Sequence, residues 1–296
     1  MPPGKIGIIQ KEDYSNITEY ILNFSDIESD NNKDWVSFSD PSSIDKPDER
    51  KSLFENRVIK NFDDISDQDI NYPAENDWTS WRRTPLGFGY SPLKQINKEN
   101  VQKLKLSWSL TMNEGSNQGT PLISQGVMFL THPGNMIQAL NAANGRLIWE
   151  YKYPYPKDSM LLGGPTKNIA IYKDKVYMAT YDAALIALDI RTGKLLWKNI
   201  KADYKDGYTH SSGPIIANGV VISGINGCER YIEDGCFITG HDPDSGKELW
   251  RTSTVALSVD INGSSWGNTP DIFRAGSDTW IAGSYDPELN IFYIGT

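Results

Sequence analysis

The stretch that decides the fold is "ALDIRTGKLLW" at residues 187–197, because nearly the same pattern occurs at 139–149 ("ALNAANGRLIW") and at 240–250 ("GHDPDSGKELW"). In each copy an apolar run leads to a turn that contains glycine, and a second short run ends in tryptophan. The copies recur about every fifty residues. Self-similarity at a fixed period indicates a fold assembled from repeated supersecondary units.

A further pair of apolar runs precedes each copy. The pairs are "PLISQGVMFLT" (121–131), "IAIYKDKVYMAT" (169–180) and "PIIANGVVISG" (214–224), and each is divided by a tight turn. Every unit therefore predicts four antiparallel strands, which is the blade of a β-propeller. A fourth unit at 280–296, "WIAGSYDPELNIFYIGT", has room for two strands. The sequence thus predicts an all-β propeller fold with about three and a third blades.

The repeated glycines and tryptophans are expected to build the fold. Gly145, Gly193 and Gly246 supply turns with positive φ. The tryptophans that follow them, Trp149, Trp197 and Trp250, are expected to pack between neighbouring blades and to donate their indole N–H.

Composition excludes some classes of function. The chain has 296 residues, of which 39% are hydrophobic, and a net charge of −9. Residues 25–77 hold 15 acidic and 6 basic side chains, so this segment alone accounts for the net charge. No basic stripe is present, which excludes nucleic acid as the expected partner. No run of about eighteen apolar residues is present, so no membrane span is expected in this chain.

The chain divides into three regions. Residues 1–24 predict a short helix from about Gln10, residues 25–76 an acidic linker or surface-wrapping segment, and residues 77–296 the propeller. The run "KLKLSWSL" (103–110) alternates as a strand does, and we expect it to pair with the last blade of a closed ring.

Cys228 and Cys236 lie in "NGCERYIEDGCFI", on a loop flanked by strands. A disulfide is the favoured interpretation and two unpaired thiols the alternative. The spacing does not suit zinc, and His132, His210 and His241 show no ligand spacing.

The repeats, together with "DWTSWRRTPLGFGYSPLKQINKENV" at the start of the propeller region, resemble the quinoprotein alcohol dehydrogenase family. The resemblance covers residues 77–296 and includes "SGINGCE" and "WIAGSYDPELN" in family order. It implies a propeller of eight blades that holds pyrroloquinoline quinone (PQQ) beside a metal ion.

The opening stretch, "MPPGKIGIIQKEDYSNITEYIL", resembles the end of a class I cytochrome c domain. That resemblance implies that Met1 is an axial haem ligand, and the alternative is an ordinary amphipathic helix. The chain is therefore expected to be a fragment of a cytochrome–quinoprotein fusion. The family's general base is expected beyond Thr296, so no catalytic residue is assigned and the fragment itself is expected to be inactive.

The family resemblance also implies roles for individual residues. Glu229 would bind the metal, calcium or a lanthanide, with a surface carboxylate as the alternative. Asn226, Gly227 and Cys228 correspond to positions that meet the PQQ carboxylates. Trp280 would form the floor beneath the quinone, with a core tryptophan as the alternative.

Five further positions show departures from the family. Gln118 and Ser211 stand where methanol dehydrogenases have Glu and Thr near the cofactor. Lys167 stands in place of an arginine, so it keeps the charge but loses the bidentate fork. Leu161 and Leu162 replace the adjacent cysteines that form a ceiling above the quinone in many members.

Together these resemblances imply a periplasmic quinohaemoprotein dehydrogenase. It would oxidise an alcohol or polyol by hydride transfer to PQQ and pass electrons to the haem c of a cytochrome c acceptor. The alternative is a non-enzymatic propeller that serves as a scaffold or binding protein and shares the tryptophan repeat.

Overall fold

The computed structural model describes residues 56–159, 161, 164–228, 232 and 235–296. The helix predicted from about Gln10 therefore lies outside the described residues. The chain forms two compact units, and residues 94–109 are the described part of the first. The second unit comprises the described residues of 55–93 and 110–296 and holds all the sheets.

The described part of the first unit contains one 3₁₀ turn, η2 (Val101–Lys103), followed by residues without regular structure. No strand is present at 103–110 in this structure, and the expected pairing with the last blade of a closed ring stays a prediction. Alternation fixes which side chains share a face, but a strand also needs the backbone hydrogen bonds of a neighbouring strand. The neighbour expected from the sequence, the last blade of a closed ring, is not among the sheets of the described residues.

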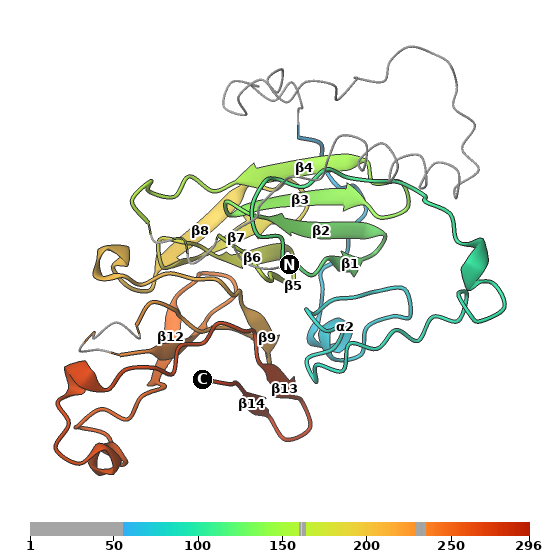
Figure 1. Ribbon diagram of the computed structural model, residues 1–296. Coiled ribbons are helices and arrows are strands. Elements are labelled where there is room, and N and C mark those ends of the chain that lie inside the picture. The colour runs from blue at the N-terminus through green and yellow to red at the C-terminus, as the bar shows by residue number, and fades with distance from the viewer. Residues whose placement is uncertain (1–55, 160, 162–163, 229–231, 233–234) are drawn as a thin grey trace, which may run out of the picture. The chain divides into compact units, whose positions relative to one another are not determined.

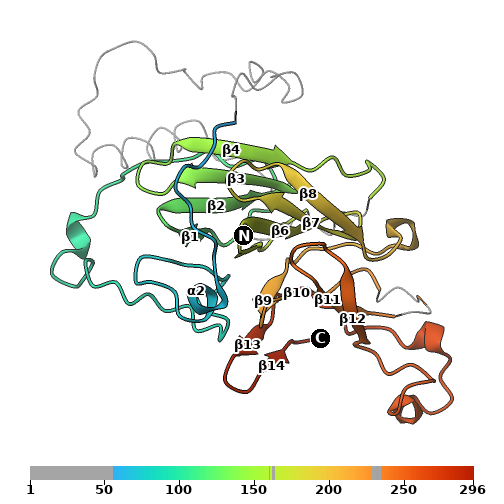
Figure 2. The ribbon, with the colours of Figure 1, turned by 180° about the vertical axis from the view of Figure 1, so that it is seen from behind.

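The second unit contains three four-stranded antiparallel sheets and one two-stranded sheet, each with its strands in sequential order (Figures 1 and 2). The first blade consists of β1 (Leu122–Ser124), β2 (Val127–His132), β3 (Met136–Asn141) and β4 (Leu147–Lys152). The second consists of β5 (Ala170–Tyr172), β6 (Lys175–Ala179), β7 (Ala184–Asp189) and β8 (Leu195–Ile200). The third consists of β9 (Ile215–Ala217), β10 (Val220–Ser223), β11 (Phe237–His241) and β12 (Glu248–Ser253). The last hairpin pairs β13 (Ser284–Asp286) with β14 (Ile291–Tyr293). The predicted blades are confirmed.

The second unit also contains short helical segments outside the sheets. They are α2 (Asp67–Asn71), η3 (Tyr204–Asp206), η4 (Gly263–Trp266) and η5 (Asp271–Phe273). Ser66 caps α2, because its hydroxyl accepts from the backbone N–H of Asp69 and the Asp69 carboxylate accepts from the Ser66 N–H.

The turns within the blades explain why the sequence repeats so closely. Gln125 and Gly126 have φ of 52° and 77°, and Asn218 and Gly219 have φ of 48° and 72°. Two successive positive φ values match the twist of a two-residue hairpin. The register between the third and fourth strands also shifts at the same place in every full blade, at Ala139/Leu140, Ala187/Leu188 and Gly240/His241.

The repeated tryptophans connect one blade to the next. Trp149 is fully buried, and its indole N–H donates to Ile190 O at 3.0 Å in the second blade. Its ring lies against Gly193, where an added Cβ would be 2.6 Å from Trp149 Cε3. Trp197 repeats the contact with Pro243 O, at 3.2 Å, and with the face of Gly246. The predicted inter-blade packing is confirmed for these two tryptophans, whereas Trp250 remains 39% exposed.

Residues 56–72, here called the strap, contact β4 of the first blade and the β5–β6 turn of the second blade. The strap bonds to the first blade through Arg57 N to Ile148 O at 2.8 Å and to the second through Ile65 N to Lys173 O at 3.0 Å. Its apolar side chains enter the core: Ile59, Phe62, Ile65 and Ile70 are at most 6% exposed. These contacts correspond to the surface-wrapping alternative for this part of the acidic segment.

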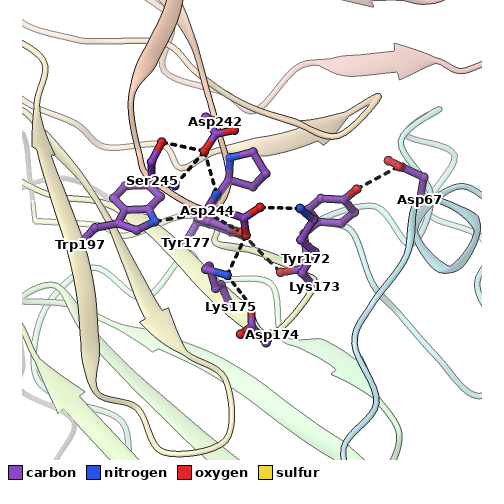
Figure 3. A network of polar contacts seen from close by, with 11 residues as sticks. Asp67, Tyr172, Lys173, Asp174, Lys175, Tyr177, Trp197, Asp242, Asp244 and Ser245 are labelled. Carbon is purple, nitrogen blue, oxygen red and sulfur yellow. Dashed lines mark hydrogen bonds and ion pairs between the residues drawn. The ribbon is translucent and has the colours of Figure 1, made fainter.

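A polar cluster closes the seam between the second and third blades beside Trp197 (Figure 3). Asp244 accepts from Lys173 at 2.6 Å and from Lys175 at 3.0 Å, and these bonds hold the pKa of its carboxyl below the usual range. Tyr172 donates to Asp67 of the strap at 2.9 Å, and burial followed by that carboxylate raises the pKa of Tyr172 to about 12. The ion pairs of Asp244 with Lys173 and Lys175 join the second and third blades, and the bond from Tyr172 to Asp67 joins the strap to the second blade, so the cluster stabilises packing.

Candidate functional site

The residues that precede the first strand of each blade lie side by side. Thr120 N donates to Lys167 O at 3.2 Å, and Lys167 N donates to Ser211 O at 3.2 Å. Thr279 N then donates to Ile225 O at 3.1 Å, which brings the segment before the last hairpin to the third blade. Backbone hydrogen bonds therefore bring segments of four successive units into one region, here called the central cluster.

Asn226 organises the polar side of the central cluster. It is 1% exposed, and its Oδ1 accepts from Ser211 N at 2.9 Å and Ser211 Oγ at 3.2 Å. Its Nδ2 donates to Asp278 Oδ2 at 2.8 Å. Asn226 also exchanges two backbone hydrogen bonds of 2.9 Å with Thr209. The amide is thus fixed from both ends, with Ser211 on one side and a carboxylate on the other.

Lys167 and Trp280 form the second part of the central cluster. Lys167 Nζ donates to Trp280 O at 3.2 Å and lies 4.4 Å from the centroid of the indole ring. Burial lowers the pKa of the Lys167 ammonium, and the nearby Asp278 carboxylate opposes that shift. The Trp280 side chain is 53% exposed, so it presents a broad aromatic surface beside a fixed positive charge.

The backbone is fixed at Gly227 and Cys228, which follow Asn226. Gly227 has a φ of +86°, and a Cβ there would lie 2.0 Å from Gly207 O, so only glycine fits. Cys228 forms a disulfide with Cys236, with the two Cα atoms 5.1 Å apart. Both cysteines are buried, and they pack with Ile225, Tyr208 and Phe237.

Gln118 and Leu161 are less closely tied to the cluster. Gln118 is exposed, and its side chain donates to Ser116 Oγ at 2.9 Å within its own loop. Leu161 is 41% exposed. Met1, Leu162 and Glu229 lie outside the described residues, so their roles stay predictions.

Asp278 is a cluster residue that sequence reasoning missed. It precedes the last hairpin just as Gln118, Lys167 and Ser211 precede the first strands of their blades. Its place shortly before a hairpin and two residues before Trp280 is the signal that could have identified it.

Three other kinds of feature are relevant among the described residues: a metal site, a membrane-spanning helix and a surface groove. Among the described residues, no group of three or more His, Cys, Asp or Glu side chains is arranged to hold a metal ion. No helix in the described part of the chain is long and apolar enough to cross a membrane. A groove of about 660 Å³ between Trp81, Leu86, Ile281 and Tyr293 contains none of the predicted cofactor residues.

The chain is similar to known propellers over most of its length. Residues 78–296 match the model of the PQQ family described as glucose/ethanol/alcohol dehydrogenase, beta-propeller domain. The chain is 35% identical over 237 residues to the quinohemoprotein alcohol dehydrogenase ADH-IIG of Pseudomonas putida. It is 37% identical over 245 residues to the dehydrogenase subunit of the quinone-linked alcohol dehydrogenase of Gluconobacter oxydans. In both comparisons the match covers 74% of this chain and 32% of the relative, so the chain spans about a third of their length.

Solved structures agree with these sequence matches. The structure of ADH-IIG from Pseudomonas putida superposes with a TM-score of 0.66 and 33% identity, over 75% of this chain and 34% of that one. A europium-containing methanol dehydrogenase superposes with a TM-score of 0.69 at 24% identity, over 74% of this chain and 42% of that one, which supports the fold alone.

Proposed function

Since the chain belongs to the PQQ-dependent glucose/ethanol/alcohol dehydrogenase family of β-propellers, we propose that its central cluster forms part of a PQQ site in an enzyme that oxidises an alcohol or polyol. The observation that carries the proposal is the pairing of Lys167 with the exposed ring of Trp280. A flat anion is matched by an aromatic surface with an ammonium group beside it.

The residues of the cluster suit binding and orientation. The Trp280 ring would stack against the plane of the quinone and exclude water from one side. Lys167 would hold a carboxylate or carbonyl oxygen with a charge-assisted hydrogen bond, since its ammonium is partly desolvated. Ser211 and Asn226, which already contact each other, would fix the edge of the site. PQQ, when bound, supplies the carbonyl that accepts a hydride from the alcohol.

The finer assignments belong to the same proposal. Glu229 would hold calcium or a lanthanide beside the quinone. Electrons would pass to a haem c of a cytochrome c domain or partner, and Met1 would be an axial haem ligand. The periplasm is the compartment that suits such an enzyme, and the Cys228–Cys236 disulfide suits an oxidising compartment. In this proposal the described residues of the central cluster receive binding roles.

Equilibrium titration of the protein with PQQ and CaCl₂ tests this proposal, with tryptophan fluorescence as the readout. We expect saturable quenching, and we expect Trp280→Ala to weaken binding about tenfold, which corresponds to about 1.4 kcal/mol of stacking. Trp266→Ala is the matched control, because Trp266 is a partly exposed tryptophan of η4 outside the cluster.

The two candidate functions give different results in this titration. No saturable binding of PQQ to the wild-type protein, or equal affinity of Trp280→Ala and wild type, would refute the dehydrogenase site. The non-enzymatic propeller would then be the better interpretation.

A further inference from the structure

A lysine is buried at the seam between the second and third blades, behind the central cluster. Lys201 follows β8 and is 3% exposed. Its Nζ donates to Ser223 O at 3.0 Å and to Gly224 O at 2.5 Å, and it lies 3.3 Å from Ser223 Oγ. The ammonium of one blade is therefore bonded to the backbone of the next.

The groups that Lys201 contacts lead directly into the cluster. Ser223 ends β10, and Gly224 precedes the segment 225–228 that carries Asn226, Gly227 and Cys228. Because Gly224 O accepts from Lys201, the start of that segment is held in place. Its far end is held by the disulfide between Cys228 and Cys236, which precedes β11.

Lys201 also reaches the segment that carries Ser211. Its Nζ lies 3.4 Å from Nε2 of the buried His210, and His210 Nδ1 lies 2.9 Å from Thr180 O. A carbonyl only accepts, so Nδ1 carries the proton that is donated to Thr180 O, while the other side of the ring faces Lys201 and the Gly224 backbone. A neutral imidazole agrees with a His210 pKa lowered to about 3 by burial and then by the charge of Lys201.

Burial of an ammonium is strongly unfavourable unless its donors are satisfied. Burial and the neighbouring Arg251 lower the pKa of Lys201, while Glu248 opposes the shift. An apolar side chain would fill the seam without that cost. A lysine at this position is explained if its ammonium hydrogen bonds keep the contacted backbone and imidazole groups in fixed positions.

We propose that Lys201 is a positioning residue for the cofactor site, which holds the segments of Asn226 and Ser211 in register through Ser223 O, Gly224 O and His210 Nε2. The inference rests on the proposed PQQ function and assigns to Lys201 no contact with the cofactor. Lys201 would act by fixing the backbone and amide groups that the cofactor meets.

The test compares Lys201→Met with Lys205→Met, because Lys205 is an exposed lysine of η3 in the same connection between blades. Hydrogen–deuterium exchange is measured first, without PQQ. We expect faster exchange of the amides of 223–228 and 209–212 in Lys201→Met, and wild-type exchange in the control. PQQ affinity is then expected to fall about tenfold in Lys201→Met alone.

The outcomes separate the two proposals. If wild type does not bind PQQ, the proposed function fails, while the exchange data still test the role of Lys201. If Lys201→Met exchanges like wild type in both segments and binds PQQ equally well, the positioning role is refuted. A uniform rise in exchange over all three blades would also overturn it, because that result indicates general destabilisation.

Lys201→Gln covers the case in which the methionine variant does not fold. Its amide keeps two N–H donors, although it is shorter and uncharged. We expect Lys201→Gln to restore part of the amide protection and part of the PQQ affinity that Lys201→Met loses. If Lys201→Met is insoluble, we expect Lys201→Gln to bind PQQ more weakly than the wild type but measurably. A folded Lys201→Gln with wild-type exchange at 223–228 and full affinity would contradict the proposal.

Discussion

Replacement of Gly193 by alanine tests whether the packing of tryptophan on glycine joins the blades. Gly193 has a φ of +69°, a conformation that costs alanine roughly 1–2 kcal/mol. The added Cβ would also lie 2.6 Å from Cε3 of Trp149, which is fully buried and cannot move away without disturbing its bond to Ile190 O. Overpacking of that kind costs about 1–3 kcal/mol. We therefore expect Gly193→Ala to lower the free energy of unfolding by about 2–5 kcal/mol.

Gly126→Ala is the matched control. Gly126 has a similar φ of +77°, but nothing lies within 4 Å of its added Cβ. It should lose only the backbone contribution of about 1–2 kcal/mol. Urea unfolding followed by tryptophan fluorescence measures both variants. Equal losses would show that the tryptophan contact contributes nothing beyond turn geometry, and docking of Trp149 on Gly193 would then not explain how the blades join.

Three further predictions concern the strap, the histidines and the disulfide. Phe62→Ala should lower the free energy of unfolding in urea by about 3–5 kcal/mol, because the ring is 3% exposed and packs edge-on against Phe129. The control, Val58→Ala at an exposed strap position, should change it by less than about 0.5 kcal/mol. An equally small effect of both variants would show that the strap is not part of the core. Burial lowers the pKa of His210 to about 3 and of His241 to about 4, so both are neutral in the folded protein while the unfolded chain takes up protons below about pH 6.5. The free energy of unfolding should therefore fall as the pH decreases from about 6.5 toward 4, by at most about 1.4 kcal/mol per pH unit for each histidine. His241→Gln should make the melting temperature less dependent on pH over that range. An unchanged pH dependence of the melting temperature would contradict the assignment. Replacing Cys228 and Cys236 together by serine should cost about 2–3 kcal/mol from the lost constraint on the unfolded chain, and on the proposed function it should also weaken PQQ binding; unaltered melting would exclude a stabilising role.

The sequence by itself determined the repeated blade. Period-two apolar runs, glycines at turns and tryptophans at a fixed offset are local signals, and each specifies a strand, a positive φ or a docking side chain. The hairpins at Gln125-Gly126 and Asn218-Gly219 and the packing of Trp149 and Trp197 followed from them. At 103–110 the alternating pattern alone does not form a strand, because a strand also needs a hydrogen-bonded neighbour and the described sheets supply none there.

Only the tertiary structure decided how the central cluster is assembled. Lys167, Asn226 and Asp278 are far apart in the sequence, and they are brought into one region because hydrogen bonds join the segments of successive units that carry them. Neither Asp278 nor Lys201 stands out by residue type, since a single acid and a single lysine are ordinary features of a surface. Their proposed roles follow from the buried position of Lys201 and from the groups of neighbouring units that each of them contacts. The sequence specifies each unit through short-range preferences, whereas the site arises from contacts between units, which are settled only when the whole sheet arrangement has formed.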